Sequence, residues 1–344
     1  MPIASNHPTV DTESVKRYAR NLTTSGHPLV SYIRDGNISL FDHGYNNQLF
    51  EREGDYGSYI LKVYPVTHGS RLVREYKVLS LLEPIRAMPE VILAETYAKD
   101  LGVPVLIYKK LPGEAVQTET LARSDVIQMQ DLWQKIQRLP IPADPMIKEF
   151  AGPRMPEDCI RYIEKTIQSM TRSVTGHMLR YQEELKQLVG LFQNLKGLDL
   201  RKRLWQDASH CLCQVDCRPG NMLKDEIGTI RLVDWEHAGL MDPIYEVAGF
   251  FWHPETLALP EQEREYGIRI YCEQSPDKYA FEKMQIYQRI LPVQWATRIL
   301  KMIDEYDEQI TRPWVSLRSV EDLSTDVMTY LQWSRMKIGE ALLR

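Results

Sequence analysis

Residues Cys211 to Glu246 read CLCQVDCRPGNMLKDEIGTIRLVDWEHAGLMDPIYE, and this stretch decides the fold. Its centre, Asp216-Cys-Arg-Pro-Gly-Asn221, places an acid and an amide on either side of a Pro-Gly turn. Two apolar runs follow, residues 222–223 and 230–233, with a polar turn between them, and the second run ends at Asp234. The pattern predicts a β-hairpin with oxygen-bearing side chains at its ends.

Three oxygen-bearing side chains in this arrangement suit phosphoryl transfer. Asp216 is the candidate catalytic residue, because a carboxylate beside an attacking hydroxyl can align the oxygen and accept its proton. Asn221 and Asp234 are candidate ligands of Mg²⁺, which prefers oxygen donors. The alternative is structural, since Asp and Asn also favour turns through their local hydrogen bonds.

A family resemblance extends over this stretch. The run QVDCRPGNML, followed by IRLVDWEHAGLMDPIYEVA, resembles the motifs of the aminoglycoside phosphotransferase and choline kinase family. That family usually has His-Gly-Asp-x-x-x-x-Asn-x-Leu, then Ile-Asp-Trp-Glu, then Asp-Pro-x-x-Asp-Leu-Ala. Two positions depart from the pattern: Gln214 replaces the histidine, and Glu246 replaces the last aspartate.

The resemblance implies an α+β, bilobal, protein-kinase-like fold. We expect a small β-rich N-terminal nucleotide-binding lobe over residues 1–110, and a larger helical lobe for catalysis and acceptor binding over residues 111–344. The implied activity is Mg²⁺-dependent transfer of the γ-phosphoryl group of ATP or GTP to a hydroxyl of a small molecule. The nucleotide would lie between the two lobes.

Lys62 and Glu75 are the next candidates, upstream of the hairpin. Lys62 lies within the strand-like run Ser58 to Tyr64, and Glu75 lies in Ser70 to Leu82, whose apolar residues follow helical spacing. The resemblance implies that the strand lysine contacts nucleotide phosphates and pairs with the helix glutamate. The alternatives are a lysine that faces solvent at a sheet edge and an exposed helix carboxylate paired with a neighbour.

Two loops complete the candidate nucleotide site. The turn containing Gly44 and Asn47 resembles the loop that covers the nucleotide, where backbone amides can face phosphate oxygens. Val103 to Tyr108 is predicted to be a buried strand, and Lys109 and Leu111 follow it where the family binds the adenine edge through backbone groups. An ordinary exit from a strand into a loop explains the Pro-Gly pair after Leu111 equally well.

The remainder of the chain is predicted to be mostly helical. Two strands are expected around the early turns, Gln48–Glu53 and Ser58–Tyr64, with a turn over Asp42–Asn47. The helices expected from apolar periodicity and from proline positions are 10–22, 121–139, 159–170, 177–195, 261–274, 277–309 (with a break considered at Pro292) and 320–343.

Composition points to a cytoplasmic protein without a membrane segment. The 344 residues carry 42 basic and 47 acidic side chains, a net charge of −5, so no broad nucleic-acid-binding surface is expected. No leader or long apolar run is visible. Five cysteines are expected to be reduced. Cys211, Cys213 and Cys217 lack the paired spacing of a zinc site, so small buried side chains are the preferred interpretation.

The acceptor is the least determined part. Only seven residues follow Asp234 before Asp242, which is too short for a protein kinase activation loop and favours a small-molecule acceptor. Asp304-Glu-Tyr-Asp-Glu308 could attract a cationic acceptor or be a solvated helix end. A quaternary-ammonium cage could form from aromatic residues that are otherwise core: Trp252, Trp295, Trp314, Tyr330 and Trp333.

A second class of function stays open. With Gln214 in place of the histidine, the chain could be a degenerate, nucleotide-binding pseudokinase or scaffold. The sequence leaves the acceptor, the choice between ATP and GTP, and the oligomeric state undetermined.

Overall fold

The computed structural model describes residues 10–22, 37–43, 47–53, 57–149, 151–173, 175–206, 210–305 and 320–342. The chain divides into two compact units. The first consists of Met1–Val116, Pro142–Lys148 and Asn221–Ala238, and the second of Gln117–Ile141, Glu149–Gly220 and Gly239–Arg344. The hairpin identified from the sequence thus joins the first unit, although it lies between two segments of the second unit along the chain.

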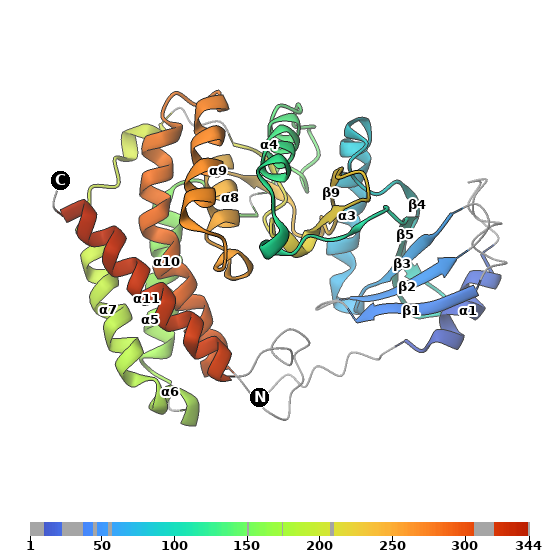
Figure 1. Cartoon of the computed structure of the whole chain (residues 1–344). Helices are drawn as coiled ribbons and strands as arrows, with labels where there is room; N and C mark the ends of the chain where they lie inside the picture. The colour runs from blue at the N-terminus through green and yellow to red at the C-terminus, as the bar shows by residue number, and fades with distance from the viewer. Residues whose placement is uncertain are drawn as a thin grey trace. The chain divides into compact units, whose positions relative to one another are not determined.

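The first unit is built on a five-stranded antiparallel sheet in the order β1-β2-β3-β5-β4 (Figure 1). Its strands are β1 Asn37–His43, β2 Gln48–Glu53, β3 Tyr59–Val63, β4 Val91–Ala98 and β5 Val103–Lys109. The predicted β2 is confirmed. The turn predicted from Asp42 is wrong at its start, because β1 continues to His43 and pairs there with Gln48. Residues 44–46 lie outside the described residues.

Helices cover this sheet. Helix α1 (Thr12–Arg20) lies within the predicted range 10–22, and it begins where the Asp11 carboxylate accepts a hydrogen bond from the Ser14 N–H. It buries Val15 and Tyr18 against the apolar side chains of the sheet. Helix α3 (Gly69–Leu82) contacts β4 and β5. The predicted amphipathic helix over 70–82 is confirmed.

The hairpin β8 (Met222–Lys224) and β9 (Ile230–Leu232) also belongs to the first unit and pairs with β6 (Glu114–Ala115). Gly113, just before β6, has φ +108°, and a Cβ there would lie 2.6 Å from the Lys224 backbone. Any other residue would clash with the hairpin, which accounts for the Pro-Gly pair at this point.

The second unit is helical. Its helices are α4 Arg123–Gln137, α5 Pro156–Met170, α6 Gly176–Arg180, α7 Gln182–Lys196, α8 Pro243–Phe251, α9 Glu261–Gln274, α10 Ala280–Asp304 and α11 Val320–Leu342. A short two-stranded sheet, β7 (Cys211–Cys213) with β10 (Gly239–Met241), is also present. Short 3₁₀ helices occur at Val66–His68, Glu83–Ile85, Thr118–Thr120, Lys202–Trp205, Pro219–Asn221 and Pro254–Thr256.

Helix α10 is the core element of the second unit, since it contacts α5, α7, α8, α9 and α11 (Figure 1). Pro292 lies inside it without ending it, so the break considered at this proline is absent. The single helix predicted over 177–195 is wrong: α6 and α7 are separate, because Tyr181 has non-helical angles of φ −102° and ψ 27°.

The predicted α+β class, with a β-rich front and a helical rear, is confirmed. No helix among the described residues has both the length and the apolar character needed to cross a bilayer.

Candidate active site

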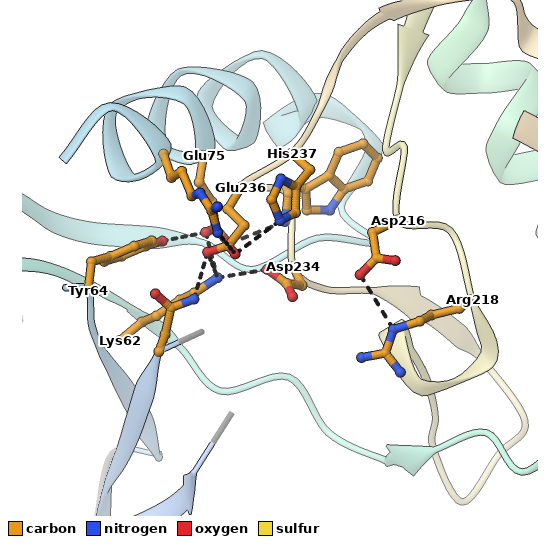
Figure 2. Close-up of polar contacts among 11 residues, drawn as sticks. Lys62, Tyr64, Glu75, Asp216, Arg218, Asp234, Glu236 and His237 are labelled. Atoms are coloured by element: carbon orange, nitrogen blue, oxygen red, sulfur yellow. Dashed lines mark hydrogen bonds and ion pairs between the residues drawn. The ribbon is translucent and has the colours of Figure 1, made fainter. Parts of the chain in front are cut away.

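Lys62 lies on β3, the middle strand of the five-stranded sheet, and is only 3% exposed. Its Nζ atom lies 2.7 Å from Glu75 Oε2, 2.8 Å from Asp234 Oδ1 and 3.4 Å from Glu236 Oε2 (Figure 2). The predicted pairing of Lys62 with Glu75 is therefore present. The two alternatives, a lysine at a sheet edge and an exposed helix carboxylate, are both wrong.

Glu75 is held by more than the lysine. The Tyr64 hydroxyl donates to Glu75 Oε2, and the Trp235 N–H donates to Oε1 at 3.3 Å. Helix α3 thus brings a carboxylate between the middle strand and the segment that follows β9. A buried carboxylate in this position is stable only if it is paired and hydrogen-bonded, which these donors achieve.

The charge of Lys62 is secured by its neighbours. Burial alone would lower the pKa of the ammonium, but Asp234 and Glu75 outweigh burial and raise this pKa well above its ordinary value. Lys62 is therefore a fixed positive charge, as a residue that contacts phosphate oxygens requires.

Glu236 belongs to this cluster and was not identified as a site residue from the sequence. It is 1% exposed and accepts from Asn47 Nδ2 at 2.6 Å and from Arg71 Nη1 at 3.3 Å. Burial raises its pKa, but hydrogen bonding to His237 and the charge of Lys62 outweigh burial, so the pKa is lowered overall. Its position two residues after Asp234 is the sequence feature that could have identified it as a site residue.

Asn47, predicted to contact the nucleotide, is buried, and its amide group donates to Glu236. Its partner in that prediction, Gly44, lies outside the described residues. The Asn47 contact therefore ties the residue just before β2 to the Lys62 cluster.

Asn221 and Asp234 lie at the same end of the β8–β9 hairpin. Met222 pairs with Leu232, and the Val233 N–H donates to the Asn221 carbonyl oxygen at 3.0 Å. Asp234 adopts a left-handed conformation with φ 65°, which turns the chain directly after the strand.

The donor set at this end of the hairpin fits Mg²⁺. It consists of amide and carboxylate oxygens, the ligands this ion prefers. The Asp234 side chain is 31% exposed, whereas the side chains of Glu75 and Glu236 are 2% and 1% exposed. One carboxylate oxygen from each of Glu75, Asp234 and Glu236 lies within 4.8 Å of the other two, but Lys62 already contacts all three side chains. Asp234 is therefore the member of this group that can face a metal ion.

Asp216 lies in the second unit, on the loop after β7, with a side chain that is 39% exposed. Val215 before it has φ 74°, a rare conformation for a β-branched residue and one that costs on the order of 1–3 kcal/mol. Glu246 holds this turn, because one of its oxygens accepts from the N–H groups of Gln214 and Val215. Glu246 stands where the resembling motif Asp-Pro-x-x-Asp has its second aspartate, and its side chain binds the backbone of this loop.

Glu246 is itself positioned by the start of α8. Asp242 caps this helix by accepting from the Ile244 N–H at 3.0 Å, and Pro243 occupies the first helical position. Trp205 Nε1 and the Tyr287 hydroxyl also donate to Asp242. Asp242 and Pro243 therefore fix the start of α8, the helix that carries Glu246, and Glu246 in turn holds the loop before Asp216.

Arg218 was not weighed in the sequence, and it lies beside the candidate catalytic residue. Its Nε atom is 3.4 Å from Asp216 Oδ2, and its Nη1 atom pairs with Glu255 (Figure 2 shows Asp216 and Arg218). Glu255 also accepts from the Gly220 N–H at 2.9 Å. The loop is thus held from both ends, by Glu246 before Asp216 and by Glu255 after it.

The segment after β5 was expected to bind a nucleotide base through its backbone groups, and some of these groups are already hydrogen-bonded within the chain. The Lys109 N–H donates to Glu90 and the Lys110 N–H donates to Ser58, so both amides are used by neighbouring strands. The Lys109 side chain is exposed, and Leu111 is half-buried beyond the strand. The Lys109 N–H is therefore already used, and the expected contacts of Lys109 and Leu111 with a nucleotide base stay predictions.

Cys211, Cys213 and Cys217 are all buried, as the sequence predicted. Of the aromatic residues considered for a cation cage, Trp252 and Trp333 contact the Arg264 guanidinium, whose Cζ lies 5.2 Å and 4.9 Å from the two ring centres. Trp314 lies outside the described residues. The chain's own arginine therefore occupies the position that an ammonium ligand would take between these rings.

A family model described as "Phosphotransferase enzyme family" matches residues 37–284. No curated protein sequence matches the chain.

Solved structures are similar over most of the chain. An ethanolamine kinase of Plasmodium vivax is 14% identical, with a TM-score of 0.64, and the match covers 97% of this chain and 93% of that one. A choline kinase of Cryptosporidium parvum Iowa II is 15% identical, with a TM-score of 0.62 and coverage of 97% and 98%. A spectinomycin phosphotransferase in complex with ADP and spectinomycin is 13% identical, with a TM-score of 0.58 and coverage of 88% and 94%. These likenesses confirm the predicted kinase-like fold.

Proposed function

The chain belongs to the phosphotransferase enzyme family and is a small-molecule kinase, and from this premise we propose that it transfers the γ-phosphoryl group of ATP or GTP, with Mg²⁺, to a hydroxyl of a small acceptor. One observation carries this proposal. Lys62, Glu75 and Asp234 come from three distant parts of the sequence, yet Lys62 contacts both acids within 2.8 Å in an otherwise buried site.

In the proposed reaction, the acceptor oxygen forms a bond to the γ-phosphorus as the bond from that phosphorus to the β–γ bridging oxygen breaks. The nucleoside diphosphate leaves with the electron pair, and the acceptor proton passes to Asp216 and then to water. Asp216 suits this role because its carboxylate is exposed and its backbone is held on both sides. A positioned general base of this kind contributes about 10²- to 10⁴-fold.

Lys62 would bind the phosphate oxygens, and Glu75 would keep its ammonium group in position. Asn221 and Asp234 would hold Mg²⁺, which when bound neutralises charge on the phosphates. Asn47 and Leu111 would contact the nucleotide through the covering loop and the segment after β5. The contact between Lys62 and Asp234 implies that the lysine and the metal-binding acid are positioned together.

A panel assay tests the proposal. The full chain is incubated with Mg²⁺ and ATP or GTP, with aminoglycosides, choline, ethanolamine, homoserine, sugars and sugar acids as acceptors, and phosphorylated products are detected by ³¹P NMR. Acceptor-dependent product formation is expected. Tight Mg²⁺-nucleotide binding without product on any acceptor would instead favour a pseudokinase and would contradict the proposal.

A further inference from the structure

Arg298, on α10 in the second unit, lies between two aromatic rings. Its Cζ atom is 5.0 Å from the centre of the Trp295 ring and 5.4 Å from that of Tyr162. Tyr162 is 39% exposed and Arg298 is partly buried, so this group reaches the surface of the unit. Tyr162 also forms a side-chain hydrogen bond with the guanidinium, and rings that contact a guanidinium face leave the other N–H groups at its edge available for hydrogen bonds.

No carboxylate in the described part of the chain forms an ion pair with Arg298. Two lysines on the same helix contrast with it, since Lys283 pairs with Asp277 and Lys301 pairs with Asp304. The pKa of Arg298 is raised above its ordinary value although burial lowers it, and the neighbours that raise it are Tyr245, Tyr162 and Cys159, none of which is a carboxylate. Arg298 is therefore a positive charge that the surrounding side chains do not neutralise.

A continuous series of contacts connects Arg298 to Asp216 within the second unit. Trp295 packs edge-to-face on His253 with ring centres 5.0 Å apart, and His253 Nδ1 accepts from the Glu255 N–H at 3.2 Å. Glu255 pairs with Arg218, which lies beside Asp216. Arg298 thus belongs to the same group of side chains as the proposed catalytic residue.

The charge of this group is positive at its Arg298 end. Burial, together with the charges of Arg218 and Arg298, lowers the pKa of His253 to about 3, so His253 is neutral near pH 7. The charge of Arg218 is balanced by Asp216 and Glu255. The Arg298 guanidinium is left as the unbalanced charge of the group.

Members of both features that favoured a cationic acceptor are already paired within the described part of the chain. Arg264 contacts the faces of Trp252 and Trp333. The buried carboxylate of Asp304 accepts from Ser173, Thr175 and Lys301, and residues 306–308 of that acidic cluster lie outside the described residues. Trp252, Trp333 and Asp304 therefore need no bound ammonium group to compensate them.

We propose that Arg298 binds an anionic group of the acceptor, a carboxylate or a phosphate ester, and that the enzyme selects anionic hydroxyl compounds over neutral and cationic ones. This inference rests on the proposed function. The anionic group would contact the Arg298 edge while the acceptor hydroxyl lies at Asp216, so the side chains between them determine which hydroxyl is presented.

Matched acceptors test the selectivity. Each carboxylate compound is compared with its neutral counterpart: gluconate with sorbitol, glycerate with glycerol, and pantothenate with pantothenol. Glycerol 3-phosphate, compared with glycerol, distinguishes a phosphate ester from a carboxylate. The measured quantity is kcat/KM for the wild type and for Arg298→Gln, Arg298→Lys and Arg269→Gln. Arg269 is an exposed arginine near an aromatic ring and is the control.

The wild type is expected to prefer the anionic member of at least one pair by about 10- to 100-fold, the range for a hydrogen bond to a charged group. Arg298→Gln should abolish the preference with little change for the neutral member, Arg298→Lys should retain part of it, and Arg269→Gln should leave it intact. Turnover with equal or greater efficiency on neutral or cationic acceptors would overturn the inference while leaving the proposed function standing.

A second measurement does not depend on turnover. Phenylglyoxal modification of arginines in the full chain is mapped by mass spectrometry with and without gluconate, glycerol 3-phosphate and inorganic phosphate. Saturable protection of Arg298 but not of Arg269 is expected. An Arg298 that is unreactive, or that none of the anions protects, would refute anion binding at this residue even if the chain proves to be an active kinase.

Discussion

The Nζ atom of Lys62 lies 2.7 Å from Oε2 of Glu75, and both side chains are almost fully buried. Glu236 and Asp234 lie on the other sides of the same ammonium group. The lysine therefore compensates several acids at once, and its removal is expected to lower stability in addition to any effect on the proposed nucleotide binding.

Lys62→Met should destabilise the protein by about 3–5 kcal/mol, because it leaves buried carboxylates without a cation. Urea unfolding followed by circular dichroism measures this loss. Lys16→Met is the matched control, since Lys16 pairs with the exposed Glu13 and should change stability by less than about 1 kcal/mol. The double variant Lys62→Met with Glu75→Gln should recover part of the loss. Equal stability of the wild type and Lys62→Met would show that the buried acids are not charged.

Asp216→Asn should lower kcat by about 10²- to 10⁴-fold and leave nucleotide affinity unchanged, because the amide cannot accept the acceptor proton. The assay is product formation with the best acceptor of the panel, together with calorimetric titration of Mg²⁺-nucleotide. Asp131→Asn, on the exposed face of α4, is the control. An unchanged kcat would remove Asp216 from the proposed role.

Asp234→Asn should raise the Mg²⁺ concentration needed for half-maximal turnover by about tenfold or more, because a charged ligand of the metal becomes neutral. Chelation of Mg²⁺ by EDTA should abolish turnover in the wild type. Glu226→Gln, an exposed acid in the turn of the same hairpin, should have no such effect. The same Mg²⁺ dependence in Asp234→Asn and the wild type would argue against metal binding by this side chain.

The raised pKa of the buried Glu246 predicts that the free energy of unfolding depends on pH. Burial raises the pKa of its carboxyl group from 4.5 to about 7, against the effect of hydrogen bonds from Cys213, Gln214 and Val215. A pKa that is higher in the folded protein gives stability that is fully present below pH 4.5 and is lost as the pH rises through 7. The shift corresponds to about 3 kcal/mol.

The test compares the wild type with Glu246→Gln by urea unfolding between pH 5 and pH 8. Gln can accept the same backbone hydrogen bonds without an ionisable group, so the stability of Glu246→Gln relative to the wild type should increase from pH 5 to about pH 7 and level off by pH 8. A constant difference between the two proteins would show that Glu246 does not titrate in this window.

Much of the fold and part of the candidate site could be predicted from the sequence because their signals are local. The spacing of Asp216, Asn221 and Asp234 predicted a hairpin with functional ends, and apolar periodicity predicted α3 and most helices of the second unit. The helix limits at Tyr181 and the strand end at His43 were not predictable, because backbone angles and pairing partners decide them.

What the sequence by itself determined is which chemistry the chain carries: the oxygen donors of the hairpin, the strand lysine and the helix glutamate are recognisable by residue type and spacing. The pairing of Lys62 with Glu75 was expected, and tertiary structure alone decided the other partners of the charged residues. Glu236 joined the Lys62 cluster, Glu246 became the support of the Val215 turn, and Arg298 was left without a carboxylate. Ion pairs form between residues far apart in the chain, and the free energy of a charge depends on its burial and its partners, which no local pattern encodes.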